Sequence, residues 1–324
     1  MKINESTIKM WSRIGSRATY GMAALALGEK YEDLIILTGD TSTSAGLDRF
    51  KKTYPEKFLD VGIAEQNMIG IAAGLSSEGL QVVTSTFSPF QTMRCCEQIK
   101  VNIGYMNQKI CMVGLASGLV LGPLGYTHCC IEDVSIMRSI PGITVISPAD
   151  CGATFKAALA ALEHEQSVYI RLTGGAPNPA VYNDDFDFTI GKANILREGS
   201  DISIFACGTM VHHALEAADL LKTGKLEATV IDMHTIKPID INIIEQISKP
   251  TSLIVTLEEH SIIGGLGSAV SEYLCTLKDK PPLLALGLPD EYGSAGEYKP
   301  LLEKRQLLPN QIANNIVNRF YSID

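Results

Sequence analysis

Short apolar runs alternate with longer amphipathic or small-residue stretches along the first half of the chain. Strands are predicted at 34–37, 82–87, 110–115, 144–147 and 168–172. Helices are predicted at 5–29, 89–104, 131–139 and 149–163. Continuous apolar runs of about four to eight residues are typical of strands that are buried on both faces. The alternation therefore predicts a parallel sheet with helices on both faces.

The same alternation starts again after a stretch without periodicity. Residues 177–190 are rich in turn formers and acids, so we predict a linker there. Further strands are predicted at 202–206, 228–232, 252–257 and 283–288, and further helices at 209–223, 240–248, 266–277 and 309–320. At about 150 residues per domain, 324 residues make two domains. The predicted fold class is α/β, with consecutive parallel-sheet domains at 1–176 and 191–324.

Composition and charge argue against several classes of protein. The hydrophobic fraction of 46% is enough for real cores, and no run of about 18 apolar residues predicts a membrane span. The first residues lack the apolar core of a signal peptide, so a cytoplasmic location is expected. The net charge of −9 argues against a nucleic-acid-binding surface. An anionic substrate would therefore need locally placed Arg or Lys.

The segment 58–77 combines a strand end, a turn at Gly62 and a helix that begins near Glu65. Residues 68–75 are small or apolar on nearly every face, which predicts a buried helix. A carboxylate in the first turn of a helix often faces water and complements the helix dipole. The other interpretation is a buried functional carboxylate. The sequence pattern alone leaves both interpretations open.

Other polar groups stand where a parallel sheet binds ligands. Asp40 and Ser44 lie in a loop that follows a predicted strand, as either ordinary turn residues or ligand contacts. His128 ends a long Gly-rich loop, 117–130, which predicts a functional or mobile segment. Arg171 lies near the end of an apolar strand, where its charge needs a partner or a ligand. Arg17 is either an ordinary helix charge or a ligand contact.

Cysteine usage points away from metal binding. The chain has eight cysteines, including the adjacent pairs Cys95-Cys96 and Cys129-Cys130, and none forms a C-x-x-C pair. Zinc ligation is therefore not expected, no metal site is predicted on this chain, and reduced thiols are the default. A nucleophilic role for Cys129 or Cys130 is disfavoured because nothing in the sequence marks a lowered pKa.

The motif D-V-G-I-A-E-Q-N-M, followed by A-A-G-L and by T-S-T-F, resembles the pyrimidine-binding domain of transketolases and the related deoxyxylulose-phosphate synthases. The resemblance implies thiamine diphosphate as cofactor. It implies that Glu65 hydrogen-bonds a ring nitrogen of the aminopyrimidine and so activates the cofactor. It further places Phe87 and Phe90 beside that ring and Asp40 near the thiazolium side.

The stretch G-Y-T-H, which ends at His128, resembles a transketolase stretch whose His contacts donor hydroxyls and shuttles a proton. The same resemblance implies that Arg17, Ser44 and Arg171 bind the distal phosphate of a sugar substrate. Three positions depart from the family: Leu124 replaces an Asp, Ala116 a second His and Cys129 a Gln. These changes remove polar groups from the substrate side, which favours an altered or less hydroxylated substrate.

The diphosphate half of such a site is not recognisable, since Gly39-Asp40 is followed by Thr41 and no G-D-G motif occurs. Mg²⁺ ligands are therefore expected from a partner, an N-terminal transketolase subunit that carries the diphosphate-binding domain. The stretch 256–270 resembles the C-terminal domain of transketolases, which implies assembly rather than chemistry. There, His260 is expected to be structural, and Gly264-Gly265-Leu266-Gly267 to be a closely packed helix start rather than a dinucleotide site.

The resemblance implies the second subunit of a split transketolase, inactive alone and assembled as an α₂β₂ heterotetramer. Such an enzyme transfers a two-carbon ketol unit from a ketose to an aldose. Two alternatives remain within thiamine chemistry: a deoxyxylulose-phosphate-synthase-like enzyme or the β subunit of a 2-oxoacid dehydrogenase. An alternative from another class is a non-catalytic regulatory subunit that has kept the fold.

Overall fold

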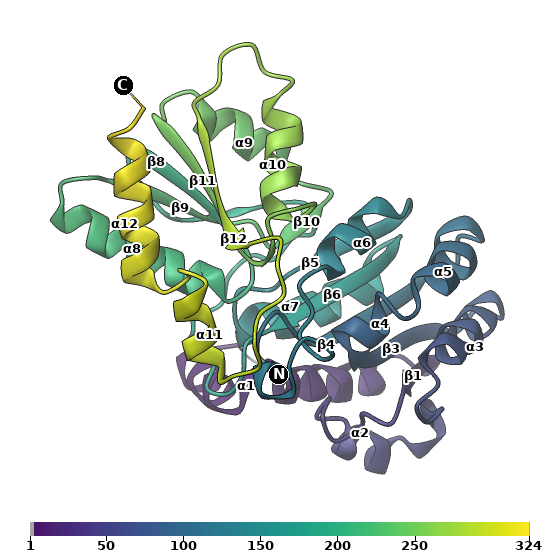
Figure 1. The fold of residues 1–324 in the computed structure, drawn as a ribbon. Coiled ribbons are helices and arrows are strands. Elements are labelled where there is room, and N and C mark those ends of the chain that lie inside the picture. The colour runs from purple at the N-terminus through teal and green to yellow at the C-terminus, as the bar shows by residue number, and fades with distance from the viewer. Residues whose placement is uncertain (1–2, 324) are drawn as a thin grey trace.

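The computed structural model describes residues 3–323, which fold into two α/β units lying side by side (Figure 1). The first unit is built on a seven-stranded sheet of order β10-β5-β6-β4-β3-β1-β2, and the second on a five-stranded sheet of order β12-β11-β8-β9-β7. All neighbouring strands pair in parallel except β10 with β5 and β7 with β9. The predicted fold class is confirmed, with one antiparallel edge strand in each sheet.

The first unit contains all the elements before residue 177. Its strands are β1 (Leu34–Thr38), β2 (Phe58–Asp60), β3 (Gln81–Phe87), β4 (Ile110–Ser117), β5 (Ile143–Ile146) and β6 (Ser167–Thr173). Its helices are α1 (Glu5–Lys30), α2 (Asp48–Thr53), α3 (Glu65–Ser77), α4 (Ser88–Gln91), α5 (Cys96–Gln98), α6 (Asp133–Ser139) and α7 (Cys151–Glu163). Short helical turns are η1 (Pro55–Lys57), η2 (Ile99–Tyr105) and η3 (Gly122–Leu124).

The second unit follows an irregular segment. Its strands are β7 (Asn194–Arg197), β8 (Ile202–Ala206), β9 (Ala228–Asp232), β10 (Thr235–Lys237), β11 (Leu253–Ser261) and β12 (Leu283–Leu288). Its helices are α8 (Met210–Thr223), α9 (Ile241–Ser248), α10 (Leu266–Leu274), α11 (Tyr298–Lys304) and α12 (Pro309–Phe320). We propose that residues 177–190 link the two domains.

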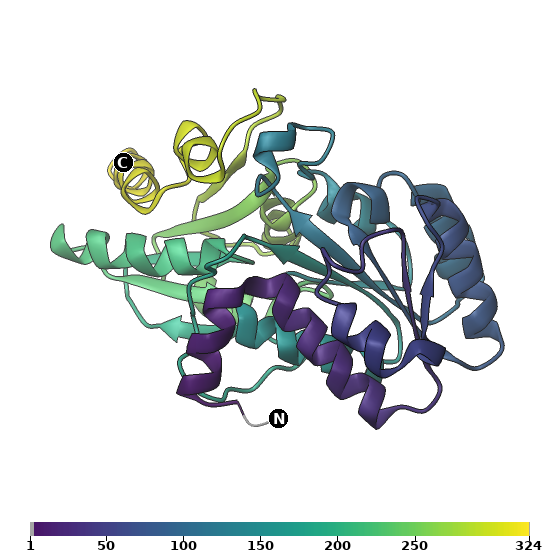
Figure 2. The ribbon, with the colours of Figure 1, turned by 90° about the horizontal axis from the view of Figure 1, so that it is seen from below.

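Alternating side chains of the central strands supply two cores to the first sheet. Met112 packs among the residues of α3, η2 and α6, whereas its neighbour Val113 packs among those of α1 and α7. Successive side chains of a strand point to opposite faces, so a continuous apolar strand fills both layers. In Figure 2, α1 is seen to bend part-way along its length, where Gly15 has φ 83°.

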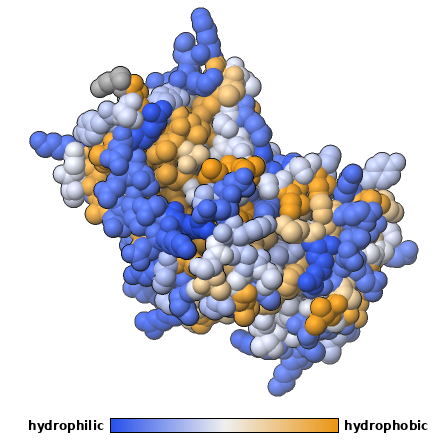
Figure 3. Space-filling view, in the orientation of Figure 1, coloured by the Kyte–Doolittle hydropathy of each residue, from blue (hydrophilic) through white to orange (hydrophobic). Residues whose placement is uncertain are grey.

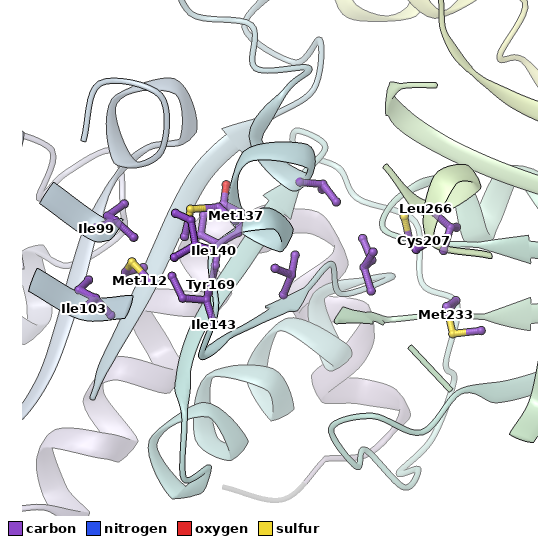
Figure 4. Close-up of a cluster of buried hydrophobic side chains, with 14 of the residues drawn as sticks. Ile99, Ile103, Met112, Met137, Ile140, Ile143, Tyr169, Cys207, Met233 and Leu266 are labelled. Atoms are coloured by element: carbon purple, nitrogen blue, oxygen red, sulfur yellow. The ribbon is translucent and has the colours of Figure 1, made fainter. Parts of the chain in front are cut away.

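The two units share one core, and the second half of the chain adds one strand to the first sheet. β10 belongs to the second half of the chain but pairs with β5 of the first sheet. One buried cluster contains Met137 and Tyr169 of the first unit together with Cys207, Met233 and Leu266 of the second (Figure 4). The two units are therefore packed together through a shared core and a shared sheet.

Two predictions about local structure were wrong. The predicted helix at 89–104 is broken into α4, α5 and the wide turn η2. The helix that carries Glu65 is not buried on every face, because Gln66, Asn67, Gly70 and Gly74 are exposed. Its other face, which includes Met68 and Ile69, packs into the core. In this chain α3 thus has one buried face and one exposed face of small and polar residues.

The surface mixes polar and apolar patches (Figure 3), and exposed apolar side chains include Ile63, Tyr105, Met106 and Leu124. Within residues 3–323, no helix combines the length and the apolar character needed to cross a membrane.

Candidate active site

The candidate site lies at the carboxyl ends of β4, β3, β1 and β2, which are neighbours in that order in the sheet. These ends carry the His128 loop, the Phe87–Phe90 segment, Asp40 and the turn into Glu65. The carboxyl ends of parallel strands meet at one edge of a sheet, which is where open α/β sheets bind ligands. The topology therefore brings together groups that are far apart in the sequence.

Glu65 begins α3 and is only 3% exposed. The preceding turn is held by Asp60, whose Oδ1 accepts hydrogen bonds of 3.0 Å from the backbone amides of Asp40 and Gly62. Gly62 has φ 70°, a left-handed conformation that glycine adopts without strain. This geometry turns the chain so that Glu65 points inward. Of the two interpretations of Glu65, the structure supports the buried carboxylate.

Arg94 is the partner of Glu65, and sequence reasoning missed it. Its Nη1 donates to Glu65 Oε2 at 2.7 Å, and its guanidinium lies 3.9 Å from the centroid of the Phe90 ring. Arg94 lies in the turn after α4, four residues after Phe90. On the helix predicted at 89–104, that spacing would have placed both side chains on one face, and it was the available signal. Among residues 3–323, Glu65 Oε1 has no hydrogen-bond partner, so one oxygen of the carboxylate is free for a ligand.

Phe87, Phe90 and His128 form one aromatic cluster. The His128 ring lies edge-on to both phenyl rings, with its centroid 5.4 Å from that of Phe90 and 6.4 Å from that of Phe87. The Nδ1 of His128 shares a 3.0 Å hydrogen bond with the hydroxyl of Thr127. Phe90 thus contacts both His128 and Arg94, the partner of Glu65.

A cavity of about 360 Å³ adjoins this cluster. It is lined by the Pro89–Arg94 segment, by Tyr126, Thr127 and Cys129 of the His128 loop, and by Glu132 and Tyr292. The second unit contributes one wall, because Tyr292 stacks edge-on against Tyr126 and donates a 3.1 Å hydrogen bond to Glu132. The space beside Phe90 is therefore bounded by both units.

Arg17 and Ser44 come from elements that pack directly on each other. A Cβ at Gly46 would lie 2.9 Å from the Arg17 carbonyl oxygen, so the Ser44 loop closely follows α1. Arg17 is half-buried, and burial lowers the pKa of its guanidinium. Within the described part of the chain, Arg17 has no ion-pair partner. A half-buried cation without a protein partner fits an anionic ligand.

The contacts of Arg171 do not support its predicted role in binding a substrate phosphate. Arg171 is 1% exposed, and its Nε donates to Asp133 Oδ2 at 2.8 Å. Its Nη2 donates to the backbone carbonyls of Glu259, at 2.8 Å, and Cys130, at 3.4 Å. The charge that needed a partner therefore has one inside the protein, and the guanidinium is closed to a ligand.

The remaining candidate residues are either exposed or buried. Asp40 is exposed at the end of β1 with φ 57°, beside the turn that places Glu65. Cys129 and Cys130 are buried; burial raises the pKa of the Cys129 thiol to about 11 and raises the pKa of Cys130 as well. Neither thiol is poised as a nucleophile. Ala116 is buried in β4, whereas Leu124 is 57% exposed in η3.

The motif at 256–270 serves internal packing. Glu258 Oε2 and Oε1 accept hydrogen bonds from the amides of Leu266 and Gly267, at 2.7 and 2.8 Å, so a carboxylate occupies the start of α10. His260 is buried, donates from Nδ1 to the Ser261 carbonyl, and has its pKa lowered to about 4 by burial. The structural interpretation of both features is consistent with these contacts.

The residues present fit the aminopyrimidine half of thiamine diphosphate. Glu65 offers a buried carboxylate with one free oxygen, and the aromatic ring of Phe90 lies against the Arg94 guanidinium that binds this carboxylate. Across residues 3–323, no cluster of three or more His, Cys, Asp or Glu side chains has a geometry that could hold a metal ion.

Family comparisons cover nearly the whole chain. The transketolase pyrimidine-binding domain matches residues 12–177, and the transketolase C-terminal domain matches residues 191–312. One subunit of the apulose-4-phosphate transketolase of Phocaeicola vulgatus is 38% identical over 280 residues, which is 86% of this chain and 88% of the relative. The 6-deoxy-6-sulfo-D-fructose transketolase subunit SqwH of Clostridium sp. is 38% identical over 297 residues, 91% of each chain.

A longer relative and a solved structure extend the comparison. The 1-deoxy-D-xylulose-5-phosphate synthase of Chlorobium luteolum is 35% identical over 304 residues, 93% of this chain but 48% of the relative. A solved structure described as a split gene transketolase, inactive beta4 tetramer, superimposes with a TM-score of 0.88 at 37% identity, over 95% of this chain and 99% of that one. The chain therefore belongs to the transketolase family, as a subunit that carries the pyrimidine-binding and C-terminal domains of a split enzyme.

Proposed function

We propose that this chain and a partner subunit form a thiamine-diphosphate-dependent transketolase that moves a two-carbon ketol unit from an anionic ketose to an aldose. The observation that carries the proposal is the arrangement of Glu65, Phe90 and His128 at one edge of the first sheet. When bound, the cofactor supplies the nucleophilic carbon and the electron sink. The chain's own residues bind, orient and move protons.

Glu65 would hold the aminopyrimidine through Oε1 and share a proton with a ring nitrogen. Phe90 and Phe87 would lie against the flat ring and keep water away from it. His128 would contact the donor through Nε2, since its Nδ1 is engaged by Thr127. Asp40 would lie near the thiazolium side of the cofactor.

The substrate side favours a donor with a negative group. The chain carries a net charge of −9, so an anion is attracted only by a local cation. Arg17, half-buried and without a protein partner in the described chain, is that cation, and Ser44 lies in the loop packed on the same helix. The names of two relatives refer to a phosphorylated and a sulfonated sugar, which supports an anionic ketose.

A partner subunit would supply what this chain lacks. We propose that it carries the diphosphate-binding domain and the oxygen ligands of Mg²⁺, that the subunits assemble as an α₂β₂ heterotetramer, and that they act in the cytoplasm. A relative named as one subunit of a transketolase and a structure described as an inactive beta4 tetramer support a chain that is inactive by itself. The exposed face of α3, with Gly70 and Gly74, lies beside Glu65 and is available for close contact with such a partner.

A second candidate is deoxyxylulose-phosphate-synthase-like chemistry, because one such enzyme is 35% identical to this chain. That reaction would consume a 2-oxoacid rather than a ketose. The two candidates are separated by a donor panel given to the assembled enzyme with thiamine diphosphate and Mg²⁺.

We expect transfer from phosphorylated or sulfonated ketoses, weaker transfer from neutral ketoses, and none from the chain alone. The preference for anionic donors should fall in Arg17→Gln, since a charged hydrogen bond contributes about 1.5–3 kcal/mol. Transfer only from 2-oxoacids would favour the second candidate. An unchanged donor preference in Arg17→Gln would refute the role of Arg17.

A further inference from the structure

The loop that carries His128 is tied to the second unit at its base. Gly118 and Cys130 close the loop with two backbone hydrogen bonds, of 2.8 and 3.0 Å. Just inside this closure, the amide of Leu119 donates to Glu259 Oε1 at 2.7 Å. Glu259 belongs to β11 of the second unit, 140 residues away in the sequence.

Both carboxylate oxygens of Glu259 accept hydrogen bonds. It is 1% exposed, and its Oε2 accepts hydrogen bonds from the hydroxyls of Tyr298, at 2.6 Å, and Thr209, at 3.0 Å. Its backbone carbonyl accepts a 2.8 Å hydrogen bond from Arg171, which also reaches the carbonyl of Cys130. A buried carboxylate with three donors is locked in position. Both ends of the loop are thus fixed by the same buried network.

The close packing at Gly118 shows how tightly this contact is made. Gly118 has φ 73°, and a Cβ there would overlap the carboxylate of Glu259. Further along the loop, the Gly296 amide of the second unit donates to the Gly122 carbonyl at 3.0 Å. Leu119 and Cys129 pack in the core of the second unit. The free part of the loop is therefore short, and it ends at His128.

We propose that Glu259 is a positioning residue, through which the second unit fixes the His128 loop and sets the place of the imidazole against Phe90. Its consequence for catalysis rests on the proposed function, whereas the positioning itself can be measured on the chain alone. The resemblance to transketolases implied that the C-terminal domain serves assembly only. These contacts give it a direct part in shaping the site.

The neighbouring residue Glu258 provides a matched control. It lies in the same strand with the same 1% exposure, but successive residues of a strand face opposite sides, and its carboxylate binds the start of α10 within the second unit. Glu259→Gln and Glu258→Gln each replace one buried carboxylate by an amide of the same shape. Only the first change alters the anchor of the His128 loop.

The test is hydrogen exchange of the isolated chain, read in peptides that cover 117–130, together with the NMR signals of the His128 ring. Glu259→Gln should speed exchange in this loop about tenfold and shift or broaden the His128 signals. Glu258→Gln should speed exchange at the start of α10 and leave both loop readouts unchanged. Equal loop exchange and unchanged His128 signals in Glu259→Gln would overturn the proposal.

If Glu259→Gln does not fold, Tyr298→Phe replaces it, because it removes one donor to the same carboxylate and leaves the side chain in place. It should speed loop exchange about twofold, and no change would again refute the anchor. In the assembled enzyme, Glu259→Gln should lower kcat about tenfold with cofactor affinity unchanged. Faster loop exchange with an unchanged kcat would show that the anchor does not serve catalysis. Failure of wild type to transfer would refute the proposed function but not the exchange result.

Discussion

The Arg94–Glu65 ion pair can be tested in the isolated chain by a double-mutant cycle of Glu65→Gln, Arg94→Gln and both together. The pair joins a carboxylate that is 3% exposed to a guanidinium that is 39% exposed, at 2.7 Å. A fully exposed pair contributes about 0–1 kcal/mol, and a hydrogen bond to a charged group about 1.5–3 kcal/mol. Because water reaches Arg94 but hardly reaches Glu65, we expect a coupling free energy of about 1–2 kcal/mol.

The single variant Arg94→Gln should lose more than the coupling, because the stacking on Phe90 is lost as well. Cation–π contacts at partly exposed sites contribute about 0.5–1 kcal/mol, so the total loss in the free energy of unfolding should be about 1.5–3 kcal/mol. The stacking term cancels from the cycle, since it does not depend on Glu65. The cycle therefore isolates the ion pair.

The assay is urea unfolding followed by circular dichroism, with the Glu5–Lys9 pair of α1 as the control. Both side chains of that pair are 69% exposed at i, i+4 spacing, so its coupling should be about 0.3–0.5 kcal/mol. A coupling for Glu65–Arg94 no larger than that of the control would refute the argument. It would mean that Glu65 is not held by Arg94 in solution.

Two further predictions concern buried charges. Arg171→Met should lower the free energy of unfolding by about 3–5 kcal/mol, since it strands Asp133 at 0% exposure. Adding Asp133→Leu should recover part of this loss, because the Tyr169 hydroxyl and two backbone carbonyls remain without their partners, and no recovery at all would contradict the pairing. Burial raises the pKa of the Asp232 carboxyl to about 8, so the folded state holds the carboxyl proton more tightly than the unfolded state does. The free energy of unfolding should therefore fall as the pH rises from about 4 to about 8. Asp232→Asn should remove a slope of about 1.4 kcal/mol per pH unit, and parallel stability profiles of variant and wild type would contradict this.

Much of the fold could be predicted because the apolar pattern reports it directly. The strands at 202–206 and 228–232 match β8 and β9, since continuous apolar runs between turn residues have few other structures. The pairing of β10 with β5 could not be predicted, because three residues carry no period and the partner strand lies in the other unit. The break of the predicted helix at 89–104 depends on tertiary packing in the same way.

Candidate site residues could be proposed from the sequence where they lie in a short motif. Glu65, Phe87, Phe90 and His128 were expected from short motifs, and the sheet brings them to one edge. Arg171 was predicted to bind a ligand because the sequence shows a charge on a buried strand but not the Asp133 that neutralises it 38 residues earlier. A buried Arg needs an anionic partner, and only the three-dimensional structure shows whether that partner is a protein side chain or a ligand.

Glu259 and Arg94 illustrate the same limit. Each acts through a contact with another element, and neither stands out in its own stretch of sequence. Arg94 could have been found by its helical spacing from Phe90. The contact between Glu259 and Leu119 spans 140 residues and has no local signal.

The most direct test of the central claim is ketol transfer by the chain assembled with its partner subunit, thiamine diphosphate and Mg²⁺, compared with Glu65→Gln. Glu78→Gln, an exposed carboxylate that follows α3, is the matched control. The account predicts transfer by wild type and by Glu78→Gln, and a loss of about 10²–10⁴-fold in Glu65→Gln, the range of a general acid–base group. Undiminished transfer by Glu65→Gln would contradict it.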